Sequence, residues 1–468
     1  MPEVARPSGL YTRLASGLLF PLHERLKGHD SVALRRSLER SQWLSADALE
    51  AQQIVRLRQF LVDVARQVPY YQRLFAEHSF APASLTTLAD LARLPLLDKA
   101  LIRANLDDLK SRSAGTLVKY NTGGSSGEPL VFYMGMGRVS HDVAAKWRAT
   151  RWWGVDIGDP EIVLWGSPVE LTRQDRYRAL RDRLLRSYLL PAFDMGDSQM
   201  DEYLSRIRRI RPRMLFGYAS ALSLLARHAD KRAMRMDNVG IRVVFTTGET
   251  LYPDQRADIE RVFGAPAANG YGSRDAGFIA HQCPEGALHL SAEHVVVEIV
   301  DADGQVVPPN ETGEVVVTHL GTAEFPFIRY RTGDMASLSS ERCACGRGLP
   351  LLGTVHGRST DFIVTSSGSR MHALALIYEV RDKPGVRAFK FIQSEDLSLE
   401  LQLQVGDDFN AEIENDIRQG VLRRMGPSTV LTLRRVDSIP PEPSGKYRYV
   451  VSRIAAARSA ADTRPEVR

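Results

Sequence analysis

The sequence is most informative at Tyr120-Asn121-Thr122-Gly123-Gly124-Ser125-Ser126-Gly127-Glu128-Pro129. From Thr122 to Gly127, three glycines and three hydroxyl side chains fill six positions. Glycines let backbone N–H groups converge on an anion, and hydroxyl groups add donors, so the stretch predicts a loop that wraps phosphate oxygens. It is not a P-loop, because no Lys-Ser or Lys-Thr pair follows the last glycine. Taken alone, it fits a plain surface turn equally well.

The residues that follow this stretch alternate between short apolar runs and helical segments. Three runs precede Gly, Ser or Thr and are typical of buried parallel strands with loops at their carboxyl ends: Ile162 to Trp165, Met214 to Phe216 and Val243 to Phe245. Two later runs, Val295 to Val300 and Glu314 to Thr318, are joined by the turn-rich residues 301–304 and predict antiparallel strands. The pattern indicates an α/β fold.

The residues before the stretch predict helices. Residues 30–110 are helical in pattern, with apolar positions at helical spacing between Leu57 and Val68, and Pro69 closes that helix. The segment from Leu10 to Leu22 is amphipathic and lacks a signal-peptide pattern. We expect it to pack against the body of the protein, and contact with a membrane or a partner is the alternative.

The length predicts two domains, because 468 residues exceed what one core supports. Gly357 and Arg358 follow a compact irregular stretch, so we place the boundary there: residues 1–356 form a large domain, whose residues 1–110 are mainly helical, and residues 357–468 form a small one. The fold class is therefore α/β, with mixed sheets and helices in the large N-terminal domain and a small α+β C-terminal domain.

Composition restricts the class of protein. The net charge of +5, from 61 basic and 56 acidic residues, is small for this length and favours solvated helix faces over a nucleic-acid surface. A mildly positive field suits polyanions such as ATP and coenzyme A. Three cysteines exclude a disulfide framework and indicate a reducing, cytoplasmic location. No run reaches the ~18 apolar residues of a membrane-spanning helix, so no integral membrane segment is expected.

Further motifs follow the glycine-rich stretch in a set order. They are Thr246-Thr247-Gly248-Glu249, Asn269-Gly270-Tyr271-Gly272-Ser273-Arg274-Asp275, Tyr330-Arg331-Thr332-Gly333-Asp334, Gly357-Arg358 and Pro443-Ser444-Gly445-Lys446-Tyr447-Arg448. Together they resemble the adenylate-forming superfamily of acyl- and aryl-CoA ligases, luciferases and peptide-synthetase adenylation domains, over about residues 60–455. Val68-Pro69-Tyr70-Tyr71, Gly272 to Asp275 and Cys343-Ala344-Cys345-Gly346-Arg347 resemble the phenylacetate–CoA ligase branch, especially its capsule-biosynthesis-type members.

The resemblance implies a nucleotide site. It assigns the residues Thr122, Gly123, Gly124, Ser125, Ser126 and Gly127 to the β- and γ-phosphates of ATP. It places Gly248 and Glu249 near the adenine and Tyr271, followed by Gly272 and Ser273, against the base. Asp275 stands where the family holds Mg²⁺ with a glutamate; because its side chain is shorter, contact through a water molecule is an alternative to direct ligation. Asp334 matches the acid that accepts from the ribose hydroxyls.

The resemblance also implies a small domain that closes and rotates as a lid. Arg358 matches a basic residue near the ribose and phosphates, and Lys446 matches the lysine that touches both the carboxylate and the α-phosphate. The hinge is expected at Ser359 to Asp361, where Thr360 replaces the family's usual acidic residue. A homodimer is a further expectation, because relatives often dimerise.

The cysteines predict a metal site. Cys283, Cys343 and Cys345 are all the cysteines of the chain, and His289 lies six residues after the first. Three thiolates and one imidazole complete a tetrahedral structural Zn²⁺ site, although Cys-x-Cys is tighter than the usual spacing. His281 and His294 are poorer candidates for the fourth ligand. The alternative is three free buried thiols.

The expected activity is that of an AMP-forming ligase joining a small carboxylic acid to coenzyme A through an acyl-adenylate. Aromatic residues suit an aryl or small apolar acid, or else belong to the core; the candidates are Phe132, Tyr133, His141, Trp165, residues 216–219 and Gly270. One alternative passes the acyl or adenylyl group to an amine, hydroxyl or carrier protein, for example in polysaccharide or secondary-metabolite biosynthesis. A binding or scaffold protein without activity is the other.

Overall fold

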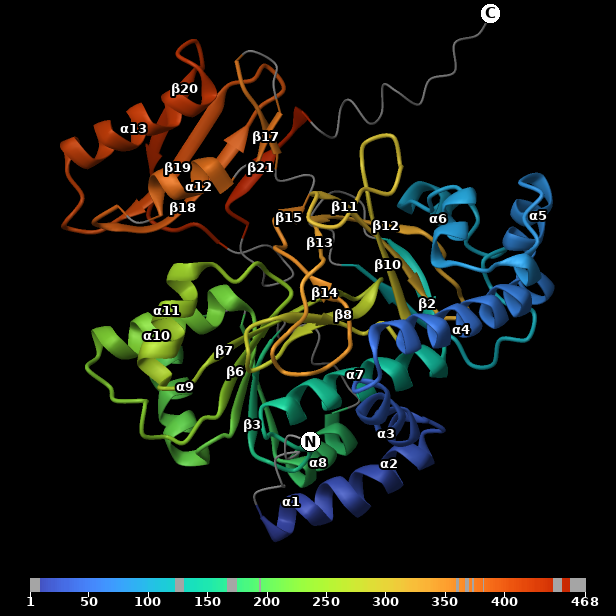
Figure 1. The fold of residues 1–468 in the computed structure, drawn as a ribbon. Helices are drawn as coiled ribbons and strands as arrows, with labels where there is room; N and C mark the ends of the chain where they lie inside the picture. Colours follow the sequence, from blue (N-terminus) through green and yellow to red (C-terminus); the bar gives the residue numbers. More distant parts are fainter. Residues whose placement is uncertain are drawn as a thin grey trace, which may run out of the picture. The chain divides into compact units, whose positions relative to one another are not determined.

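The computed structural model describes residues 9–122, 130–165, 175–192, 195–358, 362–366, 370–372, 374–381, 383–440 and 448–454. The chain divides into two compact units, Met1–Val355 and His356–Arg468. The predicted fold class, a large mixed α/β domain followed by a small C-terminal domain, is confirmed (Figure 1). The predicted limits of these domains, 1–356 and 357–468, stay a prediction.

The large unit begins with helices. They are α1 (Leu10–Leu14), a π-helical turn (Ala15–Leu19), α2 (Phe20–Leu26), α3 (Ser31–Ser41), α4 (Ala46–Gln67), α5 (Pro69–Glu77) and α6 (Lys99–Ala104), with 3₁₀ turns at Pro82–Ser84 and Leu88–Arg93. Ser45 caps α4 by accepting from the Ala48 backbone N–H at 3.3 Å. Val68 is extended and Pro69 opens α5, so the predicted end of the helix is confirmed.

A large twisted sheet forms the centre of this unit. Its strands are hydrogen-bonded in the order β13-β14-β9-β8-β7-β6-β5-β3-β4. The parallel part comprises β3 (Glu161–Leu164), β4 (Ser187–Leu190), β5 (Met214–Gly217), β6 (Val243–Thr247) and β7 (Ala267–Ser273). The antiparallel part comprises β8 (Gly277–Gln282), β9 (Leu288–Leu290), β13 (Leu338–Ser339) and β14 (Leu351–Leu352). The three predicted parallel strands are confirmed.

Helices cover both faces of the parallel strands (Figure 1). On one face, Leu215 and Val244 pack with α9 (Asp197–Ile210), α10 (Ala219–Lys231) and α11 (Pro253–Phe263). On the other face, Phe216 and Phe245 pack against Ala149 of α7 (Met136–Trp152). The helix α8 (Asp175–Leu185) precedes β4. Because both faces are covered, the strands are apolar along their length, which is the pattern seen in the sequence.

A second sheet of the large unit contains β10 (Val295–Val300), β11 (Gly313–His319) and β12 (Tyr330–Ala336) in antiparallel order. The two predicted antiparallel strands are thus confirmed. The hairpin of β1 (Val118–Asn121) and β2 (Val131–Met134) flanks the glycine-rich stretch. The main core gathers apolar residues of α4, α5 and these strands, among them Leu57, Phe132 and Tyr330.

The small unit is an α+β fold. Strands β20 (Leu431–Arg435), β19 (Leu399–Val405), β18 (Val386–Gln393) and β21 (Val450–Ser452) are hydrogen-bonded in that order. Helices α12 (Leu374–Val380) and α13 (Ala411–Met425) contact each other. The short strands β15 (Gly357–Arg358), β16 (Phe362–Val364) and β17 (Arg370–His372) precede them. In the described part of the chain, no helix is both long and apolar enough to cross a bilayer.

Candidate functional site

The carboxyl ends of the parallel strands form the first part of the site. After β3 the chain moves to β4 on one side, and β5 then lies on the other side of β3, so the order of strands reverses between β3 and β5. Ligands of open α/β sheets bind outside the strand ends at such a point. Here Trp165, which follows β3, and Tyr218, which follows β5, stack with ring centroids 4.3 Å apart.

Gly248 follows β6 and lies against this aromatic pair. It adopts a φ of +78°, which glycine tolerates and other residues rarely do. A Cβ atom at this position would lie 3.2 Å from the Tyr218 ring and 3.5 Å from Trp165. The next residue, Glu249, accepts from the Ser220 backbone N–H at 3.0 Å, at the positive end of helix α10. The predicted residues Gly248 and Glu249 therefore border the predicted acid-pocket residues Trp165 and Tyr218.

Tyr271 and Asp334, predicted from separate motifs, meet directly. The Tyr271 hydroxyl donates to Asp334 Oδ2 at 2.9 Å, although 63 positions separate them. Tyr271 lies on β7 and Asp334 on β12, so this contact joins the two sheets. Burial and the charge of Asp334 raise the pKa of Tyr271 well above its usual value, so the phenol stays protonated. Asp334 thus presents a partly exposed carboxylate held in place by a buried donor.

Asp275 lies on the turn after β7, and both of its oxygens are hydrogen-bonded. Ser273 Oγ donates to Oδ1 and the Tyr330 hydroxyl to Oδ2, each at 2.5 Å. Burial disfavours the Asp275 carboxylate, but these bonds and the charge of Lys99 hold its pKa below the usual value. The residue is therefore an anion at neutral pH and offers oxygen ligands of the kind that Mg²⁺ prefers. Tyr330 was part of a predicted motif, but its role in holding Asp275 was not predicted.

Two arginines fix the turn that carries Asp275. Arg138 was not predicted, and Arg274 was part of a predicted motif but its role was not predicted. Arg138 of α7 donates to the carbonyls of Arg274 and Asp275, each at 3.2 Å, and pairs with Asp142 at 2.9 Å. Arg274 donates to the Asn121 carbonyl at 3.1 Å. Asn121 immediately precedes the glycine-rich stretch, so the second contact ties the Asp275 turn to the base of that stretch. The spacing of Arg138 and Asp142, one helical turn, was the signal that could have indicated an internal ion pair.

The base of the glycine-rich stretch is closed by Thr122. Its backbone N–H donates to the Leu130 carbonyl, and its Oγ1 accepts from the Leu130 N–H, both at 3.0 Å. The predicted phosphate residues Gly123, Gly124, Ser125, Ser126 and Gly127 lie outside the described residues, as do Lys446 and the predicted hinge at 359–361. Arg358 lies in the short strand β15 of the small unit.

A small cavity opens beside Asp275. It is lined by Phe132, Tyr133, Arg138, Phe325 and Phe327, among others. Two of these, Phe132 and Tyr133, were predicted to line an acid pocket. Another predicted pocket residue, His141, faces His319 instead, with ring centroids 4.7 Å apart, and is 1% exposed.

His141, Asp142 and His319 lie close enough to suggest a metal site, but they do not fit one. His319 Nδ1 accepts from the Gly321 backbone N–H at 3.1 Å. A neutral His319 ring therefore carries its proton on Nε2, the atom that faces Asp142 Oδ1 at 3.9 Å, and has no lone pair there for a cation. Burial, followed by the charge of Arg138, lowers the pKa of His319 and keeps the ring neutral.

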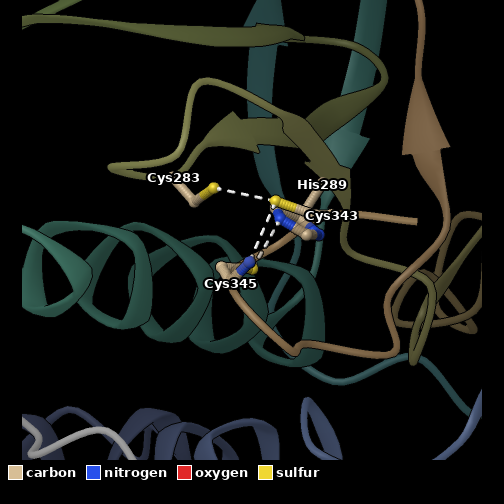
Figure 2. Close-up of side chains that lie close together, drawn as sticks. All are labelled: Cys283, His289, Cys343 and Cys345. Carbon is tan, nitrogen blue, oxygen red and sulfur yellow. Dashed lines mark hydrogen bonds between the residues drawn. The ribbon is translucent and has the colours of Figure 1, made fainter. Parts of the chain in front are cut away.

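Cys283, His289, Cys343 and Cys345 do converge (Figure 2). Their ligand atoms all lie within 4.8 Å of one another. Cys283 Sγ is 3.6 Å from Cys343 Sγ, and Cys345 Sγ is 3.3 Å from His289 Nε2. A tetrahedral zinc ion, with bonds of about 2.3 Å to sulfur and about 2.0 Å to nitrogen, places its ligands about 3.5–3.8 Å apart. The sulfur atoms are too far apart for a disulfide bond, which needs about 2.05 Å.

The protonation chemistry of this cluster also fits a cation. His289 Nδ1 lies 3.4 Å from the Leu349 carbonyl, which assigns the proton to Nδ1 and leaves Nε2 free to bind a metal. Burial and the neighbouring Cys345 raise the pKa of Cys283 to about 12, so the Cys283 thiolate is unfavourable here unless a cation neutralises it. His281 and His294 do not belong to the cluster among the described residues. The cluster joins the β8–β9 hairpin to the loop before β14.

Known proteins resemble the chain in both of its parts. Residues 186–324 match the family model of AMP-binding enzymes, and residues 363–453 match the model of the CapK C-terminal domain. Protein CapK of Staphylococcus aureus is 23% identical over 410 residues, which cover 85% of this chain and 88% of that protein. Phenylacetate-coenzyme A ligase of Pseudomonas putida is 27% identical over 344 residues, covering 72% of this chain and 76% of that protein.

Solved structures agree in fold. The crystal structure of 2-hydroxyisobutyryl-CoA ligase, in the postadenylation state with an acyl-AMP, superposes with a TM-score of 0.72 at 19% identity and covers 91% of this chain and 94% of that one. Fold, motif order and family matches together define an AMP-binding, adenylate-forming ligase. Within that superfamily, the chain is similar to CapK and to the phenylacetate-CoA ligases, at 23% and 27% identity to the two relatives above. The resemblance stated from the motifs is thereby confirmed, whereas the roles of individual residues stay predictions.

Proposed function

We propose that the chain activates a small carboxylic acid with ATP and transfers the acyl group to coenzyme A. In the first step a carboxylate oxygen bonds to the α-phosphorus, the bond from that phosphorus to the bridging oxygen breaks, and pyrophosphate leaves. In the second step the thiol loses its proton, its sulfur bonds to the acyl carbon, and AMP leaves. Both partners of the first step are anions, so the protein must align them and neutralise their charge.

The contact of Tyr271 with Asp334 carries this proposal. It sets an aromatic ring and a carboxylate side by side at the carboxyl edge of the sheet, next to Gly248. A ring of this kind stacks on a base, and a carboxylate can accept from both ribose hydroxyls at once. Thr122 begins the glycine-rich stretch to which we assign the β- and γ-phosphates. The preceding residue, Asn121, accepts a hydrogen bond from Arg274 and so connects this stretch to the turn that carries Asp275.

Asp275 is the proposed Mg²⁺ residue. Its oxygens already accept two hydrogen bonds, so the remaining lone pairs would serve the ion or a water of its shell. The ion would offset the negative charge that gathers on the phosphates during the first step. Lys446 and Arg358 of the small unit are the proposed catalytic cations, because they match the family's motif positions.

The proposed acid is aryl or small and apolar. Its binding region would lie among Trp165, Tyr218 and Gly248, where the ring pair presents an apolar surface at the end of β3 and β5. The cysteine and histidine cluster is proposed to hold a structural zinc ion. Four protein ligands leave no open coordination position, so this ion would stabilise loops and take no part in the reaction.

A second acceptor class is supported by the match of residues 363–453 to the CapK C-terminal domain. The resemblance implies that the small domain takes part in the second half-reaction, and this domain matches a model other than that of the AMP-binding enzymes. Transfer to an amine, a hydroxyl group or a carrier protein is therefore the alternative to coenzyme A.

Pyrophosphate exchange with a panel of carboxylic acids tests the first step, and mass spectrometry with and without coenzyme A separates the acceptors. We expect acid-dependent exchange in wild type and its loss in Lys446→Ala, with unchanged folding. Absence of exchange with every acid, or full exchange in Lys446→Ala, would contradict the proposal. Exchange without a thioester would favour the alternative acceptor.

A further inference from the structure

The N-terminal helical segment carries an apolar stripe that the body of the protein does not cover. Five leucines, spaced four residues apart, are exposed: Leu10, Leu14, Leu18, Leu22 and Leu26. The end members are 86% and 81% exposed, and the central one is 57% exposed. In water, such positions of a surface helix normally carry polar side chains. A contiguous exposed apolar surface of this kind marks a docking surface.

The stripe stays on one side because of the local helix geometry. Positions four apart drift by about 40° on a regular α-helix, so five of them would wind partly around it. Residues Ala15–Leu19 instead form a π-helical turn, which is wider and reduces that drift. At about 1.5 Å per residue, residues 10–26 form a ridge roughly 25 Å long. Together they make a surface element that we call the leucine stripe.

The opposite side of the segment packs against the rest of the large unit, so the leucines cannot turn inward without breaking these contacts. Thr12 Oγ1 donates to Asp159 at 2.9 Å, and Ala15 lies close against Gly158. Phe20 packs edge-on against Trp147 with centroids 5.0 Å apart. Buried Glu24 accepts from Ser31 at 2.6 Å. The expectation that this segment packs against the body is therefore confirmed, and its leucines lie on the outer side.

Helix α8 extends the apolar surface beside the stripe. Tyr11 donates to the Leu184 carbonyl at 2.7 Å, and the Arg186 guanidinium lies over the Tyr11 ring at 4.0 Å. Leu180 and Leu184, one helical turn apart on α8, are themselves exposed by 58% and 44%. Two neighbouring helices thus present leucines to solvent in the same region.

The charges around the leucine stripe favour one kind of binding partner over another. Arg13, Arg25 and Lys27 are exposed, and the only acid among residues 9–28, Glu24, is buried and hydrogen-bonded internally. A second copy of the chain would bring the same cations against these and would supply no acid from this segment to pair with them, and Asp182 on α8 is already paired with Arg181. An anionic lipid surface supplies both an apolar phase for the leucines and negative headgroups for the cations.

We propose that the leucine stripe, with Leu180 and Leu184, binds the surface of an anionic lipid bilayer. The segment would lie in the plane of the interface, with its leucines among the upper acyl chains and its arginines and lysine at the headgroups. The rest of the protein would remain in water. This inference is independent of the proposed enzymatic reaction.

Vesicle flotation of the full-length protein tests the proposal. We expect the protein to float with vesicles of equal parts phosphatidylcholine and phosphatidylglycerol, to stay behind with phosphatidylcholine alone, and to dissociate as salt is added. The variant Leu14→Glu/Leu18→Glu/Leu22→Glu should lose binding by about tenfold or more, because it places charges in the interface. Its matched control, Val55→Glu/Leu224→Glu/Val306→Glu, adds the same charge at exposed positions elsewhere and should float like wild type.

A second variant tests the proposal even if the leucine variant fails to fold. Arg25→Gln/Lys27→Gln leaves the leucines in place and should weaken binding to the mixed vesicles severalfold. The proposal is overturned if wild type floats with neither vesicle, or if the stripe variant and its matched control float equally. It is also overturned if wild type is a dimer by light scattering, does not float, and becomes a monomer in the stripe variant, because a second copy then covers the leucines.

Discussion

Replacing Tyr330 by phenylalanine removes one buried hydroxyl group, the one that donates to Asp275 Oδ2 at 2.5 Å. Tyr330 is fully buried and Asp275 is 6% exposed, so water cannot easily replace the lost donor. A hydrogen bond to a charged group contributes about 1.5–3 kcal/mol, and its loss leaves a buried carboxylate less well compensated. We expect the free energy of unfolding of Tyr330→Phe to fall by about this amount near neutral pH.

The loss should depend on pH, with a sign set by Asp275. Burial raises the pKa of Asp275, but Ser273, Tyr330 and the charge of Lys99 bring it below its usual value of 3.8. A carboxyl group with a lowered folded-state pKa stabilises the protein above its unfolded pKa, and this stability is lost as the pH falls through the folded pKa. Removing the Tyr330 hydroxyl raises the pKa of Asp275 in the folded state. The difference in the free energy of unfolding between wild type and Tyr330→Phe should therefore become smaller as the pH falls.

Urea unfolding at neutral pH and at a pH below 3.8, followed by tyrosine and tryptophan signals, measures both effects. Tyr71→Phe is the matched control: its hydroxyl donates to the Pro326 carbonyl at 3.2 Å and accepts from the Ile328 N–H at 3.1 Å, so its partners do not titrate. The decrease in the free energy of unfolding of Tyr71→Phe should be the same at both pH values. The reasoning is refuted if Tyr330→Phe is as stable as wild type. It is also refuted if the decrease in the free energy of unfolding of Tyr330→Phe equals that of Tyr71→Phe and does not change with pH.

Three further outcomes are expected. Elemental analysis should find one zinc per chain in wild type and none in Cys283→Ser. The variant should also lose the stabilisation by zinc, about 2.7 kcal/mol when free zinc is about 100-fold above its Kd. Equal metal content in both proteins would contradict this. Gly248→Ala places a Cβ 3.2 Å from the Tyr218 ring at a φ of +78°, so it should lower the free energy of unfolding by about 1–2 kcal/mol and raise the KM values for both the acid and ATP in steady-state kinetics. Arg138→Met leaves the partly buried Asp142 without its arginine and should destabilise the protein by about 3 kcal/mol in urea, with part of the loss restored by adding Asp142→Asn.

The strands could be predicted from the sequence because both faces of the sheet are covered. Val243 to Phe245 and Met214 to Phe216 are apolar without alternation, and at such short lengths this pattern is typical of a strand buried on both faces. Motif order then indicated that Tyr271 and Asp334 belong to one site. Their direct hydrogen bond could not be predicted, because it depends on how the second sheet meets the first.

The partners of Asp275 escaped prediction for a similar reason. The Tyr330 hydroxyl and the Arg138 guanidinium come from distant segments, and an arginine on a helix is usually solvated. For the leucine stripe, contact with a membrane or a partner was only the alternative expectation. Apolar residues at helical spacing indicate a covered face, and only the structure shows that Thr12, Ala15 and Glu24 form the inner side.

The central claim is that the carboxylate of the acid bonds to the α-phosphorus of ATP. An acid whose carboxyl oxygens carry a heavy isotope, supplied with ATP, Mg²⁺ and the acceptor, tests this most directly by mass spectrometry of the nucleotide product. We predict AMP that has gained one labelled oxygen, in wild type and not in Lys446→Ala. Label in inorganic phosphate with formation of ADP, or unlabelled AMP from an active protein, would contradict the claim.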